Sequence, residues 1–265
     1  MQETVERTPD VGYAGAIASG AYKVLGRRAQ EDIEFGEAVV ESTDGESIRK
    51  PLLNSLTITS STDYGASNSF DGSIAYRQVG ETEFTNVNLT AVVYGTSHAA
   101  TIAAIAAQIL TDVGTAVLQS PVVSAANKTI QLLAQEGYEI KEGTTAIAVT
   151  GGTPPTITLT QASTDVIMGL AKFLHKEHTS LTDEDAKWKA GDMVPVMTQG
   201  TMWVKTETAA TVASTPFARI QDTTGYNRGA IRTSVGSPVV GISFSGRFRG
   251  SADAAGLVKL ELNQP

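Results

Sequence analysis

The chain has 265 residues, a formal net charge of -8 at pH 7 and no cysteine. Phosphate binding depends on clustered Lys and Arg, so this charge balance argues against nucleic acid as the principal partner. The absence of cysteine excludes disulfides, thiolate metal sites and cysteine nucleophiles. Hydrophobic residues make up 41%, enough for packed cores, whereas charged residues make up only 18%, which favours a β-rich, protein-covered surface.

The first thirty residues show neither a helical nor a strand period, and glycines interrupt them throughout. This pattern predicts an extended N-terminal arm, about residues 1–30, with one or two short strands. An isolated extended segment buries too little surface to offset its ordering entropy, so the arm should lie on its own domain or on another subunit. The candidate partner contacts are Val11, Tyr13, Ile17, Arg27 and Arg28.

A thirteen-residue pattern occurs twice, first over residues 33–45 and again over residues 188–200. Glycine, acid, valine, threonine and glycine recur at the same offsets, beginning with Gly36-Glu37 and with Gly191-Asp192. Each copy predicts a turn glycine, a short strand and a second turn glycine. The pattern therefore indicates one β-domain interrupted by an insertion, with the acids as turn residues; a chance match is the alternative.

Between the two copies the composition changes at a polar turn cluster, residues 60–72, after a half-buried strand over residues 52–59. The following segment predicts an inserted α+β domain over residues 60–161. Its predicted elements are strands over 88–94, 115–123, 138–141, 145–150 and 156–160, and helices over 98–112, capped by Ser97 and Gly114, and over 125–135.

The last third of the chain is rich in short strands separated by turn glycines, as in a sandwich or barrel. The predicted strands cover residues 166–175, 193–197, 201–206, 217–222, 229–234, 239–249 and 257–262. The fold class is therefore mainly β. Residues 1–59 and 162–265 should form a discontinuous barrel- or sandwich-like body with the extended arm, and residues 60–161 the inserted domain.

Catalytic chemistry finds little support in the sequence. His175 and His178 lie near a polar loop with no third metal ligand at a recognised spacing, and the acidic run 183–185 lacks the pattern of a calcium loop. The strand–Gly95–helix junction has neither a P-loop lysine nor the three-glycine fingerprint. We therefore expect a non-enzymatic protein with no catalytic, cofactor or metal residues.

Four short segments together resemble the structural cement (capsid decoration) proteins of tailed bacteriophages: residues 12–18, 32–40, 190–204 and 256–262. Family members carry a Pro-Phe-Gly-x-Ala-Val-Val strand, an Ala-Gly-Asp-x-Val turn and a Gly-x-x-Trp-Val strand. They typically open with an arm that contains Pro-Gly. Here Glu34 replaces the proline of the Pro-Phe-Gly strand, and Val11 rather than proline precedes Gly12 in the arm. The likeness covers roughly the first fifty and the last hundred residues and leaves the insert outside it.

The resemblance implies a β-rich protein on the outer surface of the virion capsid, made in the host cytoplasm. It implies the major capsid protein as partner, together with self-association, a trimer being favoured over a dimer. No cofactor, direct nucleic-acid contact or membrane contact is implied. Such a protein clamps neighbouring capsid subunits against internal DNA pressure, and an insert on the outer face could contact the host or the environment.

Two other functions fit the same sequence. A phage tail-tube or baseplate protein also combines β-sandwiches with α+β inserts. A carbohydrate-binding or hydrolytic β-protein would use Trp203 or Trp188 against a sugar, although both tryptophans also suit core or interface positions.

Overall fold

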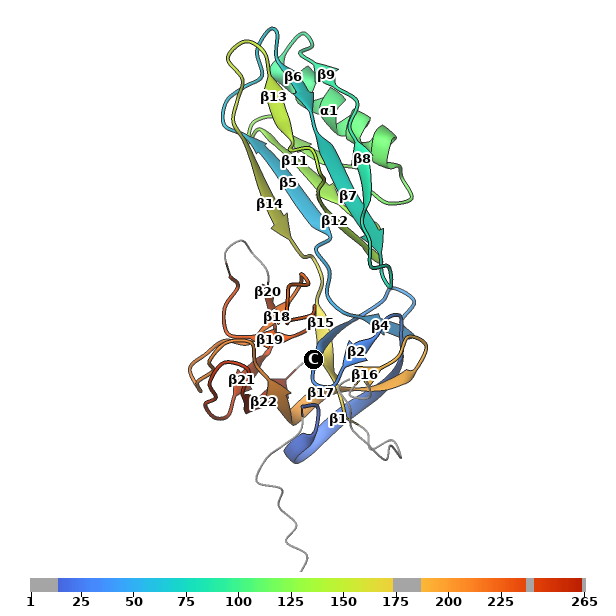
Figure 1. Cartoon of the computed structure of the whole chain (residues 1–265), viewed down its shortest axis with the longest axis vertical. Helices are drawn as coiled ribbons and strands as arrows, with labels where there is room; N and C mark the ends of the chain where they lie inside the picture. Colours follow the sequence, from blue (N-terminus) through green and yellow to red (C-terminus); the bar gives the residue numbers. More distant parts are fainter. Residues whose placement is uncertain (1–13, 174–186, 237–240, 264–265) are drawn as a thin grey trace, which may run out of the picture. The chain divides into compact units, whose positions relative to one another are not determined.

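The structure, a computed structural model, describes residues 14–173, 187–236 and 241–263. The chain divides into two compact units, Met1–Pro51 with Val166–Pro265, and Leu52–Asp165 (Figure 1). Three features named above lie outside the described residues: the candidate contacts Val11 and Tyr13, the histidines His175 and His178, and the acidic run 183–185.

The first unit is built from strands along its two chain segments. They are β1 (Ile17–Ala29), β2 (Ile33–Glu34), β3 (Ala38–Glu41), β4 (Ser47–Arg49), β15 (Ile167–Ala171), β16 (Lys187–Trp188), β17 (Met193–Lys205), β18 (Phe217–Arg219), β19 (Ile231–Arg232), β20 (Gly241–Ser243), β21 (Gly246–Phe248) and β22 (Leu257–Asn263).

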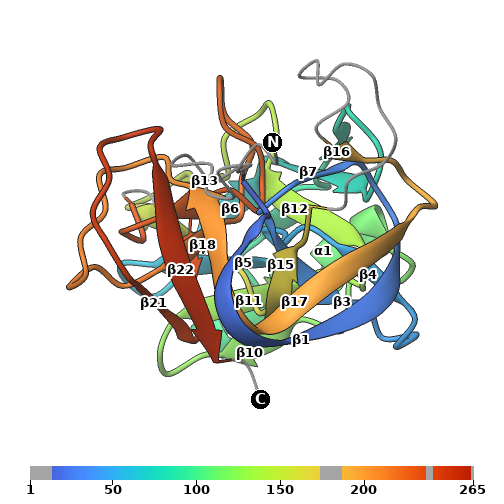
Figure 2. The ribbon, with the colours of Figure 1, turned by 90° about the horizontal axis from the view of Figure 1, so that it is seen from below.

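Five of these strands close into a barrel in the order β1-β4-β3-β15-β17, because β17 pairs back onto β1 (Figure 2). Each barrel strand contributes to one buried apolar cluster, which Ile33 of β2 and Trp188 of β16 complete. Alternate residues of a strand point to opposite faces, so a closed barrel buries one residue in two from every strand. The barrel interior is thus a filled core.

The opposite face of the barrel wall packs against a second layer. β22 and β21 extend the sheet from the second half of β17, and the small sheet β19-β18-β20 contributes Ala218 and Ile231 to the same cluster. The cluster also holds Met202 and Val204 of β17 and Phe248 of β21. β17 therefore has buried side chains in both cores of this unit.

The second unit contains one helix in the described chain, α1 (His98–Val113), and several short sheets. Its strands are β5 (Ser55–Ser60), β6 (Ser69–Asp71), β7 (Ser73–Gln78), β8 (Thr85–Asn88), β9 (Val92–Val93), β10 (Val122–Ser124), β11 (Thr129–Leu133), β12 (Tyr138–Glu142), β13 (Ala148–Thr150) and β14 (Ile157–Ala162). The sheets are ordered β10-β11-β5-β14, β12-β7-β8 and β13-β6-β9. The buried face of α1 joins β5, β7, β11 and β12 in one core.

The mainly β fold class is confirmed, and so is the helix predicted over residues 98–112. The Ser97 hydroxyl accepts a hydrogen bond from the Ala100 amide at 3.2 Å, and Gly114 follows the helix at a φ of 95°. The Ser97 side chain thus pairs with an amide that the start of a helix leaves unbonded, and the Gly114 amide donates to the Leu110 carbonyl at the other end.

The second predicted helix, residues 125–135, is wrong: this segment contains strand β11. Ile130 and Leu132 are buried, whereas Thr129, Gln131 and Leu133 are half-buried, so burial alternates with a period of two. β11 pairs along its whole length with β5. The short apolar stripe fitted either period, and pairing with a central strand decided between them.

Several predicted strands are shorter or joined differently. The strand predicted over 115–123 is reduced to β10, and the one over 88–94 is divided between β8 and β9. The strands predicted over 193–197 and 201–206 are one continuous strand, β17. β5, which the sequence placed with the body, pairs instead with β11 and β14 of the second unit. That the chain is a cement-like domain carrying an inserted domain stays a prediction.

The described part of the predicted N-terminal arm contains a long strand. Residues 17–29 form β1, which pairs antiparallel with β17 from Ile17 opposite Met202 to Arg28 opposite Met193. This part of the predicted arm belongs to the barrel wall of its own domain. The alternation of apolar residues in β1 is obscured by register shifts between Ile17 and Val24, which explains why no strand period is visible in the sequence.

The two ends of the second unit are tied together by Asp165. Its carboxylate accepts hydrogen bonds from the Leu52 amide at 2.8 Å and from Asn54 Nδ2 at 3.0 Å. A charged acceptor is stronger than a neutral one, and an amide left without it pays a desolvation cost. Asp165 therefore anchors the first strand of the unit to its last residues.

We expect Asp165→Ala to destabilise the second unit by about 1–3 kcal/mol, because the Leu52 amide loses its acceptor. Hydrogen–deuterium exchange should show faster exchange across β5. The matched control is Asp63→Ala, whose side chain is 65% exposed beside Lys128, and it should cost less than about 0.5 kcal/mol. If the β5 amides exchange equally slowly in both variants, the role given to Asp165 is contradicted.

Candidate functional site

The two copies of the repeated pattern form the same hydrogen-bonded turn. In the first, the Glu37 amide donates to the Glu34 carbonyl at 3.3 Å, and the Glu37 carboxylate accepts from the Glu34 amide at 2.8 Å. In the second, the Asp192 amide donates to the Lys189 carbonyl at 3.0 Å, and the Asp192 carboxylate accepts from the Lys189 amide at 3.0 Å. The acids act as the turn residues that the pattern predicted.

Both turns are fixed to the barrel in the same way. The Gly36 amide donates to the Ala171 carbonyl at 2.8 Å, and the Ala171 amide donates to the Glu37 carbonyl at 2.8 Å. The Gly191 amide donates to the Ala29 carbonyl at 2.7 Å, and the Ala29 amide donates to the Asp192 carbonyl at 2.9 Å. Equivalent turns therefore close on the ends of two different barrel strands, β15 and β1.

The segments that lead into the turns pair with each other. β2 and β16 are antiparallel, with Ile33 opposite Trp188, which are equivalent positions of the two copies. Lys189 and Lys187 approach Asp32 at 3.3 and 3.2 Å between Nζ and Oδ2, so opposite charges face each other across the pair. The repeat is thus related by a local pseudo-twofold axis through Ile33 and Trp188.

The copies differ at their last glycine. Gly45 lies in the turn between β3 and β4, as predicted, whereas Gly200 lies inside β17 with a φ of 119°. Side chains disfavour this conformation, so glycine permits a local bend without ending the strand. The prediction of a second turn at Gly200 is therefore wrong.

The chain enters the first unit through residues 14–16, named here the arm root. The Gly15 amide donates to the Trp203 carbonyl at 2.7 Å, the Phe173 amide donates to the Gly15 carbonyl at 2.8 Å, and the Trp203 amide donates to the Ala16 carbonyl at 2.8 Å. A Cβ at Gly15 would lie 2.7 Å from the Phe173 nitrogen. The arm root thus fits between two barrel strands where only glycine has room.

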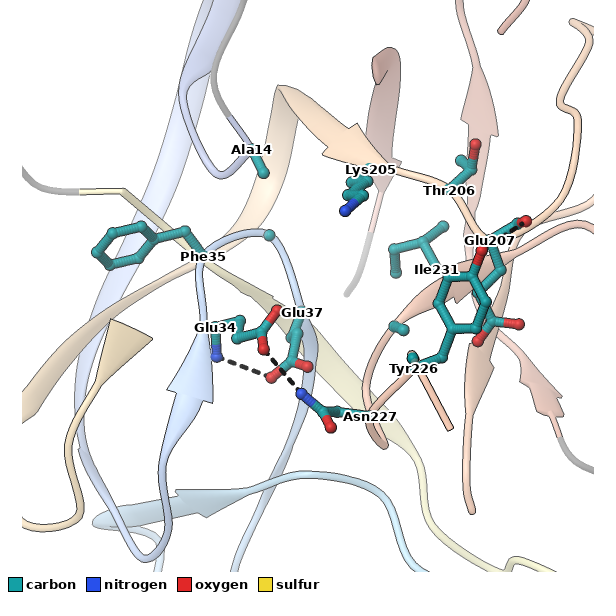
Figure 3. Close-up of a pocket in the computed structure, with 13 residues that line it drawn as sticks. Ala14, Glu34, Phe35, Glu37, Lys205, Thr206, Glu207, Tyr226, Asn227 and Ile231 are labelled. Atoms are coloured by element: carbon teal, nitrogen blue, oxygen red, sulfur yellow. Dashed lines mark hydrogen bonds between the residues drawn. The ribbon is translucent and has the colours of Figure 1, made fainter. Parts of the chain in front are cut away.

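A pocket of about 120 Å³ lies beside the arm root and the first turn (Figure 3). Figure 3 shows Glu34 and Glu37 near Asn227 on one side, with Tyr226, Glu207 and Ile231 grouped on the other. Asn227 Nδ2 donates to Glu34 Oε1 at 2.7 Å. Glu34, Glu37 and Asn227 are thus joined by hydrogen bonds on one side of the pocket, which Lys205 also lines.

Glu37 is the electrostatically unusual residue of this pocket, with only 5% of its surface exposed. Burial raises its pKa from the ordinary value of 4.5 to about 8, and the Lys50 charge opposes this rise. Removing a carboxylate from water disfavours its charged form, so the side chain holds its proton at neutral pH. Glu37 is a neutral turn acid inside the barrel wall.

Two buried ion-pair networks flank the pocket. Arg228 Nη2 donates to Glu31 Oε2 at 2.7 Å, and the other Glu31 oxygen accepts from the Lys50 amide at 2.9 Å. Arg219 holds Glu207 through two side-chain hydrogen bonds, with Arg232 Nη1 3.8 Å from the same carboxylate. Burial lowers the pKa of Arg232, while Glu207 opposes this shift. Breaking such a pair leaves an uncompensated charge, so these networks hold the loops around the pocket in place.

The predicted contact residues are distributed rather than gathered. Ile17 is half-buried against the outer core of the unit, and Arg27 pairs with Glu41 at 2.7 Å. Arg28 is exposed at the end of β1.

The sequence did not identify the pocket or the two buried networks, because their members come from segments up to about two hundred residues apart and share no motif.

Among the described residues, no group of three or more His, Cys, Asp or Glu side chains is placed to hold a metal ion. The described helix, with 16 residues, is too short to cross a membrane. Trp188 is buried, with its Nε1 donating to the Lys172 carbonyl at 3.1 Å, and Trp203 is half-buried with Lys259 Nζ 5.1 Å from its ring centre. Trp188 therefore has a core position.

We expect Glu37→Gln to remove the pH-dependent contribution that the Glu37 carboxyl group makes to the free energy of unfolding. The folded pKa lies above the unfolded value, so the associated stability is present below about pH 4.5 and is lost as pH rises through about 8. The variant should match the parent near pH 4.5 and be more stable by a few kcal/mol above pH 8. Urea denaturation followed by tryptophan fluorescence measures this, since both tryptophans lie in the first unit.

Asp192→Asn is the matched control, because it changes the equivalent turn acid at a less buried position. A stability difference between the parent and Glu37→Gln that stays constant from pH 5 to pH 9 would contradict a protonated Glu37.

We expect Gly15→Ala to cost at least about 1 kcal/mol more than Gly191→Ala. Both glycines have positive φ, 78° and 90°, but a Cβ at Gly191 meets no atom within 4 Å, whereas one at Gly15 meets backbone. The comparison separates the conformational cost from the steric one. Equal melting temperatures for the two variants would show that the arm root is not packed as described.

Comparison with known families is consistent with this architecture. A family model described as structural cement protein (E217 gp24/Pam3 gp6) matches residues 94–263. No curated protein matches the chain. The match begins inside the second unit, so the expectation that the family likeness leaves the whole insert outside it is wrong, whereas its extension to the first fifty residues stays a prediction. The match spans more than half of the chain, and the protein therefore belongs to the structural cement protein family of bacteriophages.

Proposed function

We propose that the protein binds the outer surface of a phage capsid as a homo-oligomer and stabilises contacts between neighbouring major capsid protein subunits. Family membership carries the proposal, because the family is one of phage structural proteins. The geometry adds a filled barrel, interlocked turns and buried ion pairs, which suit a body that transmits force between neighbours without changing shape.

The arm root supports a role for the N-terminal segment in attachment. Hydrogen bonds at Gly15 and Ala16 fix the arm root, which directly follows residues 1–13 in sequence, to the barrel. Thirteen extended residues span at most about 45 Å, enough to reach beyond the barrel to another subunit. A contact made by Val11 or Tyr13 would thus be anchored to a rigid body.

The edge of β1 supports the same function. Among the described residues, β1 pairs with β17 along one side, and on its other side with β4 only at Arg28 and Ala29. An unpaired strand edge presents backbone donors and acceptors to which an extended segment of another chain can add. This edge is a suitable place for a capsid segment to bind.

Binding to purified expanded capsids that lack the protein tests the proposal. We expect saturable occupancy at symmetric positions on the head, visible by electron microscopy, and a higher temperature or force for capsid rupture. Imaging the labelled protein on complete phage particles separates the alternative, because label on the tail would identify a tail protein. Absence of binding to any shell would contradict the proposal.

Deleting residues 1–13 should lower shell occupancy by about tenfold or more, because the anchored contact is lost. The truncated protein keeps Gly15 and should retain its melting temperature, whereas deletion through residue 20 should lower it by removing the arm root. A full-length variant with residues 1–13 in scrambled order controls for chain length. Full occupancy by the truncated protein would exclude these residues from attachment.

A further inference from the structure

One face of the first unit gathers basic side chains although the chain as a whole is acidic. It is the outward face of β17, β22 and β21, opposite the buried Met202, Val204, Leu260 and Phe248. Residues alternate between the two faces of a sheet, so its members follow from the register. We define the basic face as Trp203, Lys205, Arg247, Arg249 and Lys259, with Glu261 as its acid.

The pairing brings these residues into two rows. Trp203 lies opposite Lys259, and the Arg249 amide donates to the Lys259 carbonyl at 2.8 Å, so these three side chains are neighbours. In the next row, Glu261 lies opposite Arg247 and also contacts Arg249. Four cations against one carboxylate leave the face with a charge of about +3 at neutral pH.

The basic face is open to solvent within its unit. The side chains of Arg247 and Arg249 are 62% and 41% exposed, and Trp203 is half-buried among them. Exposed ion pairs contribute little to folding, so stability does not explain this concentration of charge. Tryptophan and arginine together are the residues most enriched at the energetic centres of protein interfaces.

The complementary charge lies in the second unit. Residues 52–165 contain nine Asp or Glu against three Lys or Arg, a formal net charge of -6. Several of these acids serve internal contacts: Asp165 and Asp112 accept backbone amides, and Glu139 pairs with Arg77 at 2.7 Å. Three of the other six acids lie at one exposed end of the sheet β12-β7-β8.

We define this end as the acidic corner, comprising Glu81, Glu83 and Glu136, all exposed. The turn after β7 and the start of β12 hold it together, since the Val79 amide donates to the Gly137 carbonyl at 2.8 Å and the Gln78 amide to Glu81 Oε2 at 2.8 Å. Arg77 is matched by Glu139, and Lys141 lies over the Phe84 ring. The corner is therefore a rigid, net negative surface.

We infer that the basic face of one copy binds the acidic corner of a second copy. The two surfaces have opposite charge, each is exposed, and each is held by paired strands. Because they are different surfaces, the contact is heterologous: every copy offers one of each, and repetition closes a ring when the rotation permits it. The inference rests on the homo-oligomeric part of the proposed function and names the surfaces that assemble the oligomer.

Mass measurement by analytical ultracentrifugation tests this with charge reversal. We expect an oligomer whose apparent dissociation constant rises about tenfold or more between about 50 and 500 mM NaCl, since exposed charges are screened. Arg247→Glu with Arg249→Glu should weaken assembly at least as much, and so should Glu83→Arg with Glu136→Arg. Combining all four substitutions should restore assembly to within about threefold, because every contact is again between opposite charges.

Lys23→Glu with Lys189→Glu is the matched control: it makes the same change in net charge at exposed positions outside the basic face and should leave the mass unchanged. Circular dichroism confirms that each variant is folded. The inference is overturned when the parent is monomeric at every salt concentration, when either reversal leaves the mass unchanged, or when the combined variant stays dissociated.

Shell binding is measured separately on the same variants. A parent that assembles in solution but binds no capsid contradicts the proposed function and leaves this inference supported. A monomeric parent whose occupancy falls after reversal of the basic face shows that the face binds the capsid protein, which overturns the inference while supporting capsid binding.

Discussion

The first unit depends on one strand, β17, having partners along both edges. One edge pairs with β1, and the opposite edge pairs first with β15 and then with β22. The first half therefore closes the barrel and the second half begins the outer layer. Gly200, at a φ of 119°, lies between the halves and permits the strand to bend from one layer to the other. Both apolar cores of the unit include side chains from this strand.

The glycine–acid turns complete the barrel that β17 closes. Their entry strands pair through Ile33 and Trp188, two side chains that contribute to the barrel core. Each turn exchanges two backbone hydrogen bonds with an alanine at the end of a barrel strand. The neutral Glu37 side chain gives its turn a hydrogen bond at 2.8 Å without placing a full charge in the wall. A barrel closed in this way suits a protein whose proposed task is to hold other subunits in place.

The extent of the family match changes how the second unit should be viewed. The match runs from residue 94, near the start of α1, through the end of β22. The matched region therefore includes the α1 helix and the strands of the second unit that follow it, β10 to β14. The surfaces that the two units present also differ in charge, and the proposed assembly depends on this difference.

The sequence by itself determined the class of the fold, the helix 98–112 with its caps, the two glycine–acid turns and the family. These features depend on local spacing, on capping chemistry and on the conformational freedom of glycine, all of which are visible in a few consecutive residues. Only the tertiary structure decided that residues 129–133 form a strand, that Gly200 bends a strand rather than ending it, and that residues 17–29 belong to the barrel. In each case a partner strand distant in sequence supplied the hydrogen bonds, and pairing of that kind leaves no local signal.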